Sequence, residues 1–245
     1  MGLVDGPGVR TVVFMQGCRL RCRYCHNPDT WGLGGEAVEP EALLERILRF
    51  RPYFERSGGG VTFSGGEPLM QSAFLSEMLR LCRANGIHTC IDTAGVCRGD
   101  AGCALDHTDL VIYDVKHEDA QAYREITGHL MDDTLRFVEQ VRERGIPMWV
   151  RHVVVPGLTD SETHMRRLSE YVRTLPNVQR VELLAYHRLG AHKYGALGMA
   201  EPLAGVPQMD AARCKALERQ YFDEINDPNA ANTVESTEKN KTKHR

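Results

Sequence analysis

Short apolar runs alternate with longer helical patterns along most of this chain. The runs are rich in β-branched and aromatic residues and predict six strands, at residues 10–16, 61–63, 87–91, 109–115, 148–155 and 178–185. Apolar residues at helical spacing predict helices over residues 39–50, 71–84, 131–144, 160–174 and 208–222. Pro40 suits a first helical turn, and Gly86 and Gly145 follow the ends of two other helices.

About six strand–helix units of similar length indicate a parallel α/β fold. The spacing favours a partial (β/α)6 barrel with outer helices, and a doubly wound open sheet is the alternative. From residue 226 onward the chain is polar, and Val234 is its only aliphatic residue larger than alanine. We therefore expect one domain over residues 1–225 and a disordered polar tail over residues 226–245.

Polar residues of unusual type fall at or near the end of each predicted strand. Because the carboxyl ends of parallel strands meet on one face of a barrel, these residues are expected to share a site there. In chain order they are Cys18, Cys22 and Cys25, then Gly65, Gly66 and Glu67, then Asp92, then Asp114 and Lys116, then Arg151, and finally His187.

Composition and charge narrow the range of partners. The chain has 245 residues, of which 42% are hydrophobic and 26% charged, as is ordinary for a globular protein. Its formal net charge of −3 argues against nucleic acid or an anionic membrane as a partner. No apolar run approaches the roughly 18 residues of a membrane span, and the first residues lack the features of a signal peptide. We expect a cytoplasmic protein.

Three of the eight cysteines form a C-x-x-x-C-x-x-C cluster at Cys18, Cys22 and Cys25. In the cytoplasm such a cluster indicates metal binding more often than disulfides. Three thiolates on a four-iron cluster would leave one iron open to an outside ligand, which is useful for catalysis. The alternative is a structural zinc site in which His26 is the fourth ligand.

The sequence around these cysteines resembles the signature of the activating enzymes of glycyl-radical enzymes, which are radical S-adenosylmethionine (SAM) proteins. Residues 6–27 match G-x-G-x-R-x-x-x-F-x-x-G-C-x-x-x-C-x-x-C-x-N without a break. The segments SGGEP, HTCIDTAG, DLVIYDVK, WVRHVVVPG and ELLAYHRLGAHKY extend the similarity to about residue 200. It is strongest to the branch of the family that acts on pyruvate formate-lyase, and no cysteine lies between Cys25 and Gly65 where other branches insert a ferredoxin-like domain.

The resemblance implies a partial barrel, a 4Fe-4S cluster on Cys18, Cys22 and Cys25, and SAM bound to the open iron. It also implies that SAM is cleaved reductively and that the resulting radical takes a hydrogen atom from a glycine of the partner. The cluster then needs a low-potential reductant such as flavodoxin. The implied partner is a glycyl-radical enzyme, pyruvate formate-lyase in the branch named above.

The same resemblance assigns roles to single residues. The SAM contacts it implies are Tyr24, Gly65, Gly66, Glu67, Asp92, Arg151 and His187. It places Asp92, Asp114 and Lys116 near a monovalent cation, and Asp5 and His26 near the peptide glycine of the partner. By themselves, Asp114 and Lys116 also read as an ordinary ion pair, His187 as a structural histidine and Tyr24 as a partly buried tyrosine.

Three other functions remain open on the sequence. An activase of anaerobic ribonucleotide reductase would use the same chemistry, a radical SAM enzyme could act on a small molecule, and an iron–sulfur or zinc protein need not be catalytic. One departure from the family concerns the first strand, because only four residues precede Asp5 whereas family members usually carry a longer lead-in strand. We therefore expect the packing around the first strand to suffer.

Overall fold

The computed structural model describes residues 2–97 and 99–227. The elements are β1 (Arg10–Met15), η1 (Pro28–Thr30), α1 (Pro40–Leu48), α2 (Arg51–Ser57), β2 (Gly60–Gly65), η2 (Pro68–Gln71), α3 (Ser72–Ala84), β3 (His88–Thr93), α4 (Gly102–Leu105), β4 (Leu110–Asp114), α5 (Ala120–Thr127), α6 (Asp132–Glu143), β5 (Met148–Val154), α7 (Glu162–Thr174), β6 (Val178–Ala185), α8 (Ala191–Ala196) and α9 (Ala211–Asn226).

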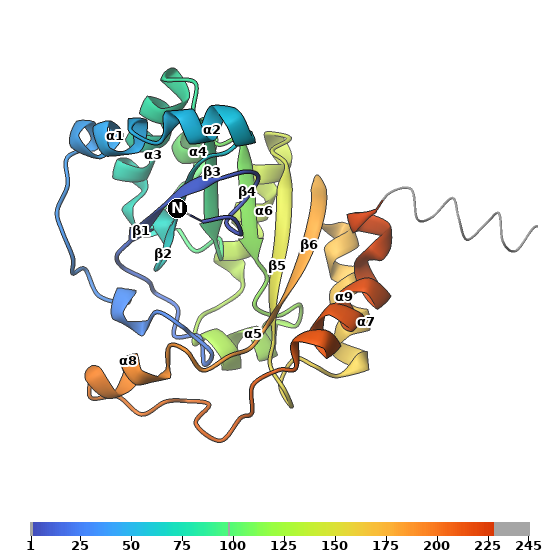
Figure 1. Ribbon diagram of the computed structural model, residues 1–245. Coiled ribbons are helices and arrows are strands. Elements are labelled where there is room, and N and C mark those ends of the chain that lie inside the picture. Colours follow the sequence, from blue (N-terminus) through green and yellow to red (C-terminus); the bar gives the residue numbers. More distant parts are fainter. Residues whose placement is uncertain (1, 98, 228–245) are drawn as a thin grey trace, which may run out of the picture.

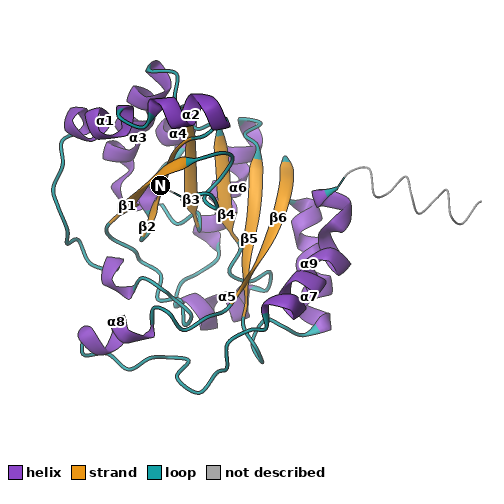
Figure 2. Ribbon diagram, viewed as in Figure 1, coloured by secondary structure: helices purple, strands orange, loops and turns teal. Residues whose placement is uncertain are grey.

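The six strands form one parallel sheet in which the order in space, β1 to β6, is the order in the chain. A doubly wound sheet would reverse direction at a switch point, so this order excludes the alternative and confirms the parallel barrel-type fold. Among the described residues β1 and β6 are the two edges, so the barrel is partial. The sheet curves, with helices on its outer side (Figures 1 and 2).

The core lies between the sheet and these helices. Side chains from successive strands are fully buried there, among them Val61, Phe63, Ile91, Val111 and Val150. The helices bury one apolar face each; α3, for instance, contributes four buried residues at helical spacing: Leu75, Met78, Leu79 and Cys82. Burial of apolar area is the main term that holds these layers together.

Arg10 fastens the start of the barrel, although its charge is completely buried. Its guanidinium donates to the Thr62 hydroxyl at 2.6 Å and to the carbonyl oxygens of Val61 at 2.6 Å, Pro7 at 3.1 Å and His88 at 3.2 Å. Gly2 and Arg10 also exchange two backbone hydrogen bonds, of 2.9 and 3.0 Å. The short lead-in therefore pairs with β1, contrary to the expectation that packing would suffer here.

The helices α2, α4, α5 and α8 are not among the predicted elements. The predicted helix 39–50 instead ends at Leu48, and a second helix starts at Arg51. At the other end, α9 continues to Asn226, whose amide donates to the Val181 carbonyl at 2.9 Å and accepts from the Val181 N–H at 2.8 Å. Asn226 is thus part of the fold rather than of the predicted tail. Residues 228–245 of that tail lie outside the described residues, and the predicted division into domains stays a prediction.

Candidate radical SAM site

The loop that carries the three cysteines is held by its backbone. The Arg21 and Arg23 N–H groups donate to the carbonyls of Thr127 at 2.7 Å and Ile126 at 2.9 Å, which places the loop against the end of α5. The Cys18 N–H donates to the Trp31 carbonyl at 3.2 Å, and the Cys25 N–H donates to the Cys22 carbonyl at 3.0 Å. The thiols therefore project from a fixed turn.

Burial sets the chemistry of these thiols. It raises the pKa of Cys18 to about 11, with help from the charge of Glu67, and the pKa of Cys22 to about 12. It also raises the pKa of Cys25. Free thiols of this kind are protonated at neutral pH, so metal binding must release their protons.

The spacing of the sulfur atoms bears on which metal group they could hold. Three thiolates on a single zinc ion lie about 3.8 Å from one another, because each Zn–S bond is about 2.3 Å long. Among the described residues, Cys18, Cys22 and Cys25 do not have their sulfur atoms all within 4.8 Å of one another. His26, the fourth ligand of the zinc alternative, donates from Nε2 to the His187 carbonyl at 2.8 Å. The three sulfur atoms are thus soft ligands that lie farther apart than three ligands of one zinc ion would, which fits a four-iron cluster better than zinc.

Gly65 and Gly66 hold the loop after β2 close to the cysteine loop. Gly65 has a φ of +112°, and a Cβ there would lie 2.5 Å from the backbone of Met15. A Cβ on Gly66 would lie 2.6 Å from the carbonyl oxygen of Gly17. Glycine is therefore required at both positions by packing against the protein itself, whatever ligand their carbonyls accept.

Glu67 is buried and fully engaged with the protein. Its Oε1 accepts from the Thr93 hydroxyl at 2.6 Å and the Leu69 N–H at 3.2 Å, and its Oε2 accepts from the Ala94 N–H at 2.9 Å. Burial raises its pKa to about 7, although these three hydrogen bonds act in the opposite direction. Glu67 thus joins the loops that follow β2 and β3 at the edge of the cavity.

Arg151 connects three parts of the barrel mouth. Its Nε donates to Glu182 at 2.8 Å, its Nη1 lies 3.7 Å from Asp92, and its Nη2 donates to the Val4 carbonyl. Burial lowers the pKa of Arg151, but the charges of Asp92 and Glu182 outweigh burial, and the net shift is upward. Asp92 also accepts from the Ser64 hydroxyl at 2.8 Å. Arg151 is thus buried and paired with two carboxylates in the described structure.

Asp114 and Lys116 form an ion pair at the end of β4. Burial lowers the pKa of Lys116, but the nearby negative charges, with Asp114 the largest, leave it well above its usual value. The Lys116 ammonium also lies 5.6 Å from the ring centroid of the buried Tyr24. The second carboxylate oxygen of Asp114 is buried and has no hydrogen-bond partner in the described structure, which leaves it available to a cation.

His26 and His187 lie beside each other rather than on opposite sides of the cavity. Their rings stack with centroids 4.0 Å apart. From α8, Lys193 donates to Asn27 at 2.8 Å, and the Tyr194 hydroxyl donates to the Cys25 carbonyl at 3.0 Å. The segment after β6 thus covers the cysteine loop.

A cavity of about 200 Å³ brings together most of the predicted residues. It is lined by Cys18, Cys22, Tyr24, Cys25, His26, Gly65, Gly66, Glu67, Asp92, Asp114 and Lys116, among others. Arg151 and His187 are not among the lining residues; Arg151 pairs with Asp92, and His187 stacks on His26, both of which line the cavity. Asp5 is half-buried outside the lining, where its carbonyl accepts from the Thr62 hydroxyl at 2.6 Å.

The sequence did not single out several residues that shape this site. Ser64, Thr93 and Asn27 act through hydrogen bonds to Asp92, Glu67 and Lys193. The guanidinium carbon of Arg21 lies over the ring of Trp31, 4.7 Å from the ring centroid. Ser64 and Asn27 stand inside the SGGEP segment and the cysteine signature, so their position in a motif was the available signal.

Comparison with known proteins agrees with this geometry. The family model of the radical SAM superfamily matches residues 12–169, so the chain is a radical SAM protein. Membership of this superfamily implies a 4Fe-4S cluster and SAM as cofactors. The chain is 52% identical to the pyruvate formate-lyase-activating enzyme of Clostridium pasteurianum, over 92% of this chain and 94% of that one. It is 43% identical to the enzyme of the same name from Staphylococcus epidermidis, over 86% and 87% of the two chains. The chain belongs to the family of pyruvate formate-lyase-activating enzymes.

Solved structures confirm the fold. A domain of a pyruvate-formate lyase-activating enzyme from Bacteroides vulgatus aligns with a TM-score of 0.54 at 24% identity, over 68% of this chain and 94% of that one. Streptococcus suis SuiB, solved with its precursor peptide SuiA, aligns with a TM-score of 0.65 at 18% identity, over 90% of this chain and 46% of that one. Within the described residues, none of the helices has the length and apolar character needed to cross a membrane.

Proposed function

We propose that this chain activates pyruvate formate-lyase by removing a hydrogen atom from one of its glycine residues. The observation that carries the proposal is the position of three thiols, one buried and two partly buried, on a fixed loop that lines one cavity together with the Gly65–Glu67 loop. The 52% identity to a named activating enzyme over nearly the full length of both chains supports the choice of partner.

Cys18, Cys22 and Cys25 would hold the 4Fe-4S cluster, and the loss of their protons on binding would supply three thiolate ligands. When bound, the reduced cluster supplies the electron that cleaves SAM into methionine and a 5′-deoxyadenosyl radical. The protein contributes position and exclusion of water. Tyr24 is buried beside the thiols and would shield the cluster from solvent.

The loop after β2 would receive the charged end of SAM. An ammonium group needs acceptors; Gly65, Gly66 and Glu67 line the cavity, and their carbonyls and the carboxylate would supply them. Because the Glu67 oxygens already accept three hydrogen bonds, we assign Glu67 mainly to fixing this loop and to adding negative charge beside the ammonium. Asp92, Arg151 and His187 complete the proposed set of SAM contacts.

We assign a monovalent cation to the oxygen of Asp114 that lacks a partner. Asp92 lines the same cavity, and Lys116 balances the charge of Asp114. One negative charge is therefore left over, which suits a cation of charge +1 better than one of charge +2. Hard cations prefer oxygen ligands, which these carboxylates supply.

The partner's glycine would enter at the mouth of the cavity, near His26 and Asp5. His26 lines the cavity, and burial followed by the charge of His187 lowers its pKa, so it is neutral at physiological pH. We further propose flavodoxin or a similar low-potential protein as the reductant, and a cytoplasmic location.

Formation of 5′-deoxyadenosine tests the enzymatic part of this proposal without the partner. The full chain is reconstituted with iron and sulfide in the absence of oxygen, reduced and mixed with SAM. We expect 5′-deoxyadenosine and methionine in equal amounts. An intact reduced cluster that binds SAM and yields no 5′-deoxyadenosine above a control without reductant would refute the proposal.

A further inference from the structure

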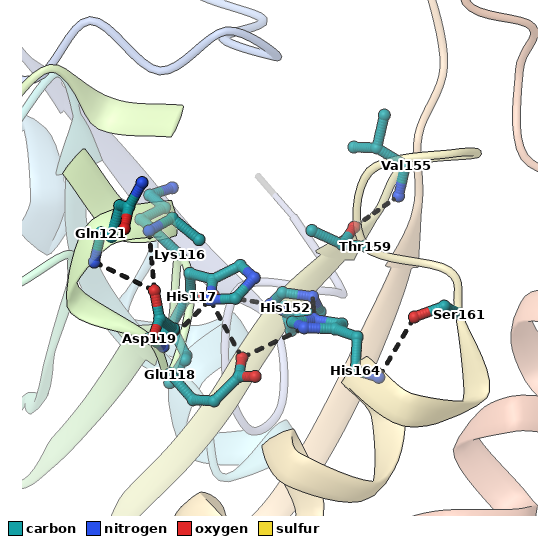
Figure 3. A network of polar contacts seen from close by, with 12 residues as sticks. Lys116, His117, Glu118, Asp119, Gln121, His152, Val155, Thr159, Ser161 and His164 are labelled. Atoms are coloured by element: carbon teal, nitrogen blue, oxygen red, sulfur yellow. Dashed lines mark hydrogen bonds and ion pairs between the residues drawn. The ribbon is translucent and has the colours of Figure 1, made fainter. Parts of the chain in front are cut away.

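A second polar cluster lies where the loop after β4 meets the start of α7 (Figure 3). The loop after β4 carries Lys116, which lines the SAM cavity, and then His117 and Glu118, which contact α7 instead. His164 in the first turns of α7 completes the cluster. These are the one set of three potential metal ligands whose donor atoms lie within 4.8 Å of one another among the described residues.

The donor atoms converge on one carboxylate oxygen. Glu118 Oε2 lies 3.2 Å from His117 Nδ1 and 3.1 Å from His164 Nδ1. The side chains of Glu118 and His164 are only 9% and 6% exposed. Both Glu118 oxygens and His164 Nδ1 nevertheless lack a hydrogen bond of acceptable geometry. Buried polar atoms without a partner are rare and call for an explanation.

Neighbouring hydrogen bonds fix which imidazole nitrogens carry protons. His152 Nδ1 lies 2.8 Å from the Val115 carbonyl, which can only accept, so this nitrogen is protonated. His152 is completely buried, and burial favours the neutral ring, so its Nε2 carries a lone pair. His164 Nε2, 3.0 Å away, therefore donates to it, and in the neutral ring His164 Nδ1 is left with a lone pair toward Glu118.

His117 Nδ1 is the third donor atom at this point. The Asp119 N–H donates to it at 3.0 Å, so this nitrogen is unprotonated and its lone pair is engaged by that hydrogen bond. A metal ion bound here would take the lone pair in place of the Asp119 N–H, beside His164 Nδ1 and the carboxylate oxygen of Glu118. The separations of 3.1 and 3.2 Å are close to the edge of about 3.3 Å for a tetrahedron of ligands bound at about 2.0–2.1 Å.

We propose that His117, Glu118 and His164 bind one divalent transition-metal ion of the zinc class. Two histidines and one carboxylate are a common ligand set for zinc and related ions, with water completing the coordination. The contact of His164 with His152, and of His152 with the Val115 carbonyl, orients the His164 ring as the outer hydrogen bonds of metal-binding histidines do.

A hollow of about 340 Å³ beside Glu118 gives the ion a route from solvent. It is lined by Glu118, Asp119, Arg167, Glu170, Tyr171 and Thr174. Arg167 is its one basic residue and Glu118, Asp119 and Glu170 are acidic, so the entrance favours a cation overall.

A proton on His164 is the competing explanation, because a charged imidazole would pair with Glu118. It accounts for His164 Nδ1 and Glu118 Oε2, but it leaves Glu118 Oε1 buried without a partner and the unprotonated His117 Nδ1 3.2 Å from a carboxylate oxygen with no proton between them. A divalent ion would bind all three side chains. It would also fasten the loop that carries Asp114 and Lys116 to α7, next to the SAM cavity on the opposite side of the sheet.

Metal analysis of the cluster-loaded full chain tests this site, since the cluster occupies the cysteines. After incubation with zinc and removal of loose metal, we expect one zinc per chain in addition to the iron. The variants Glu118→Gln and His117→Gln should bind zinc at least about a hundredfold more weakly and lose the rise in melting temperature that zinc produces. Glu170→Gln, in the same hollow but outside the ligand set, is the matched control and should bind zinc normally.

Cobalt reports the identity of the ligands. Cobalt bound at the proposed site should give weak visible bands and no thiolate charge-transfer band. The proposal is overturned if the cluster-loaded chain retains no zinc, if Glu118→Gln and His117→Gln bind zinc as the control does, or if cobalt shows thiolate ligation. Because zinc content is read on the purified chain, the result is independent of whether the chain activates pyruvate formate-lyase.

Discussion

His26 and His187 stack with their ring centroids 4.0 Å apart, and His26 Nε2 donates to the carbonyl oxygen of His187 at 2.8 Å. One residue follows the last cysteine of the cluster loop, and the other follows the last strand of the barrel. The contact therefore links the proposed cluster ligands to the segment that covers them.

Removal of the His187 ring should weaken SAM binding while leaving the cluster in place. A stacked aromatic pair contributes about 0.5–1.5 kcal/mol, so His187→Ala should lower SAM affinity about two- to twelvefold. His187→Phe keeps the stacking surface and is the control. Titration of SAM into the cluster-loaded protein measures the effect, and equal affinities for the wild type and His187→Ala would contradict the role given to this pair.

Cys22 is the most buried of the three thiols and is expected to be indispensable for the cluster. Cys22→Ala should abolish the iron content and the brown colour after anaerobic reconstitution. Cys103 is exposed and lies away from the cavity, so Cys103→Ala should load normally. Iron and sulfide analysis would count against the assignment if the Cys22 variant loaded as fully as the Cys103 variant.

Glu67 should make the stability of the fold depend on pH. Its pKa is raised from 4.5 in the unfolded chain to about 7 in the folded one, so between these values the folded state binds more protons. The free energy of unfolding should therefore fall as the pH rises from about 4.5 to 7, as far as this group contributes, and stay level above.

The variant Glu67→Gln isolates that contribution. Its amide cannot accept from all three donors, so the variant should be less stable by about 1–3 kcal/mol at pH 5. The wild type loses stability as Glu67 ionises, whereas the glutamine of the variant does not titrate. The difference in unfolding free energy between the two should therefore shrink as the pH rises to 8. Urea unfolding across this range measures both effects, and a deficit that grows with pH would show that the pKa is not raised.

Arg151 and Arg180 both contact Glu182, and they form a matched pair. Arg151 is 9% exposed and joins β5 to β3 and the N-terminal segment, whereas Arg180 is 51% exposed. Arg151→Met leaves the buried Asp92 without this cation and Glu182 with Arg180 alone, so we expect a loss of about 3–5 kcal/mol in the free energy of unfolding. Arg180→Met should cost about 1 kcal/mol or less. Similar losses in urea unfolding would contradict the structural role of Arg151.

The order of strands could be predicted from the sequence because the apolar runs are separated by recognisable helices. The end of β6 was predicted at Ala185, and β1 and β5 were correct to one residue. The helices α2, α4, α5 and α8 were missed because each is too short for a helical spacing of apolar residues to stand out. Asp119, which caps α5 by accepting from the Gln121 and Ala122 N–H groups, was the signal available for one of them.

Part of the candidate site could likewise be predicted from the sequence. The cysteines, Glu67 and the Asp114–Lys116 pair stand in recognisable motifs near the ends of predicted parallel strands, so their convergence on one cavity could be expected. The contact between His26 and His187 depends on how the segment after β6 folds back, and no local pattern shows that. His117, Glu118 and His164 lie on two separate elements, and only the packing of α7 on the loop after β4 brings them together.

The central claim is that this chain generates a radical on a glycine of pyruvate formate-lyase. The reduced, cluster-loaded protein is mixed with SAM and purified pyruvate formate-lyase without oxygen, and the sample is frozen for electron paramagnetic resonance. We predict the doublet of a glycyl radical, which should be absent with Cys22→Ala. The account would be contradicted if the complete mixture formed 5′-deoxyadenosine and yet gave no glycyl radical on the partner.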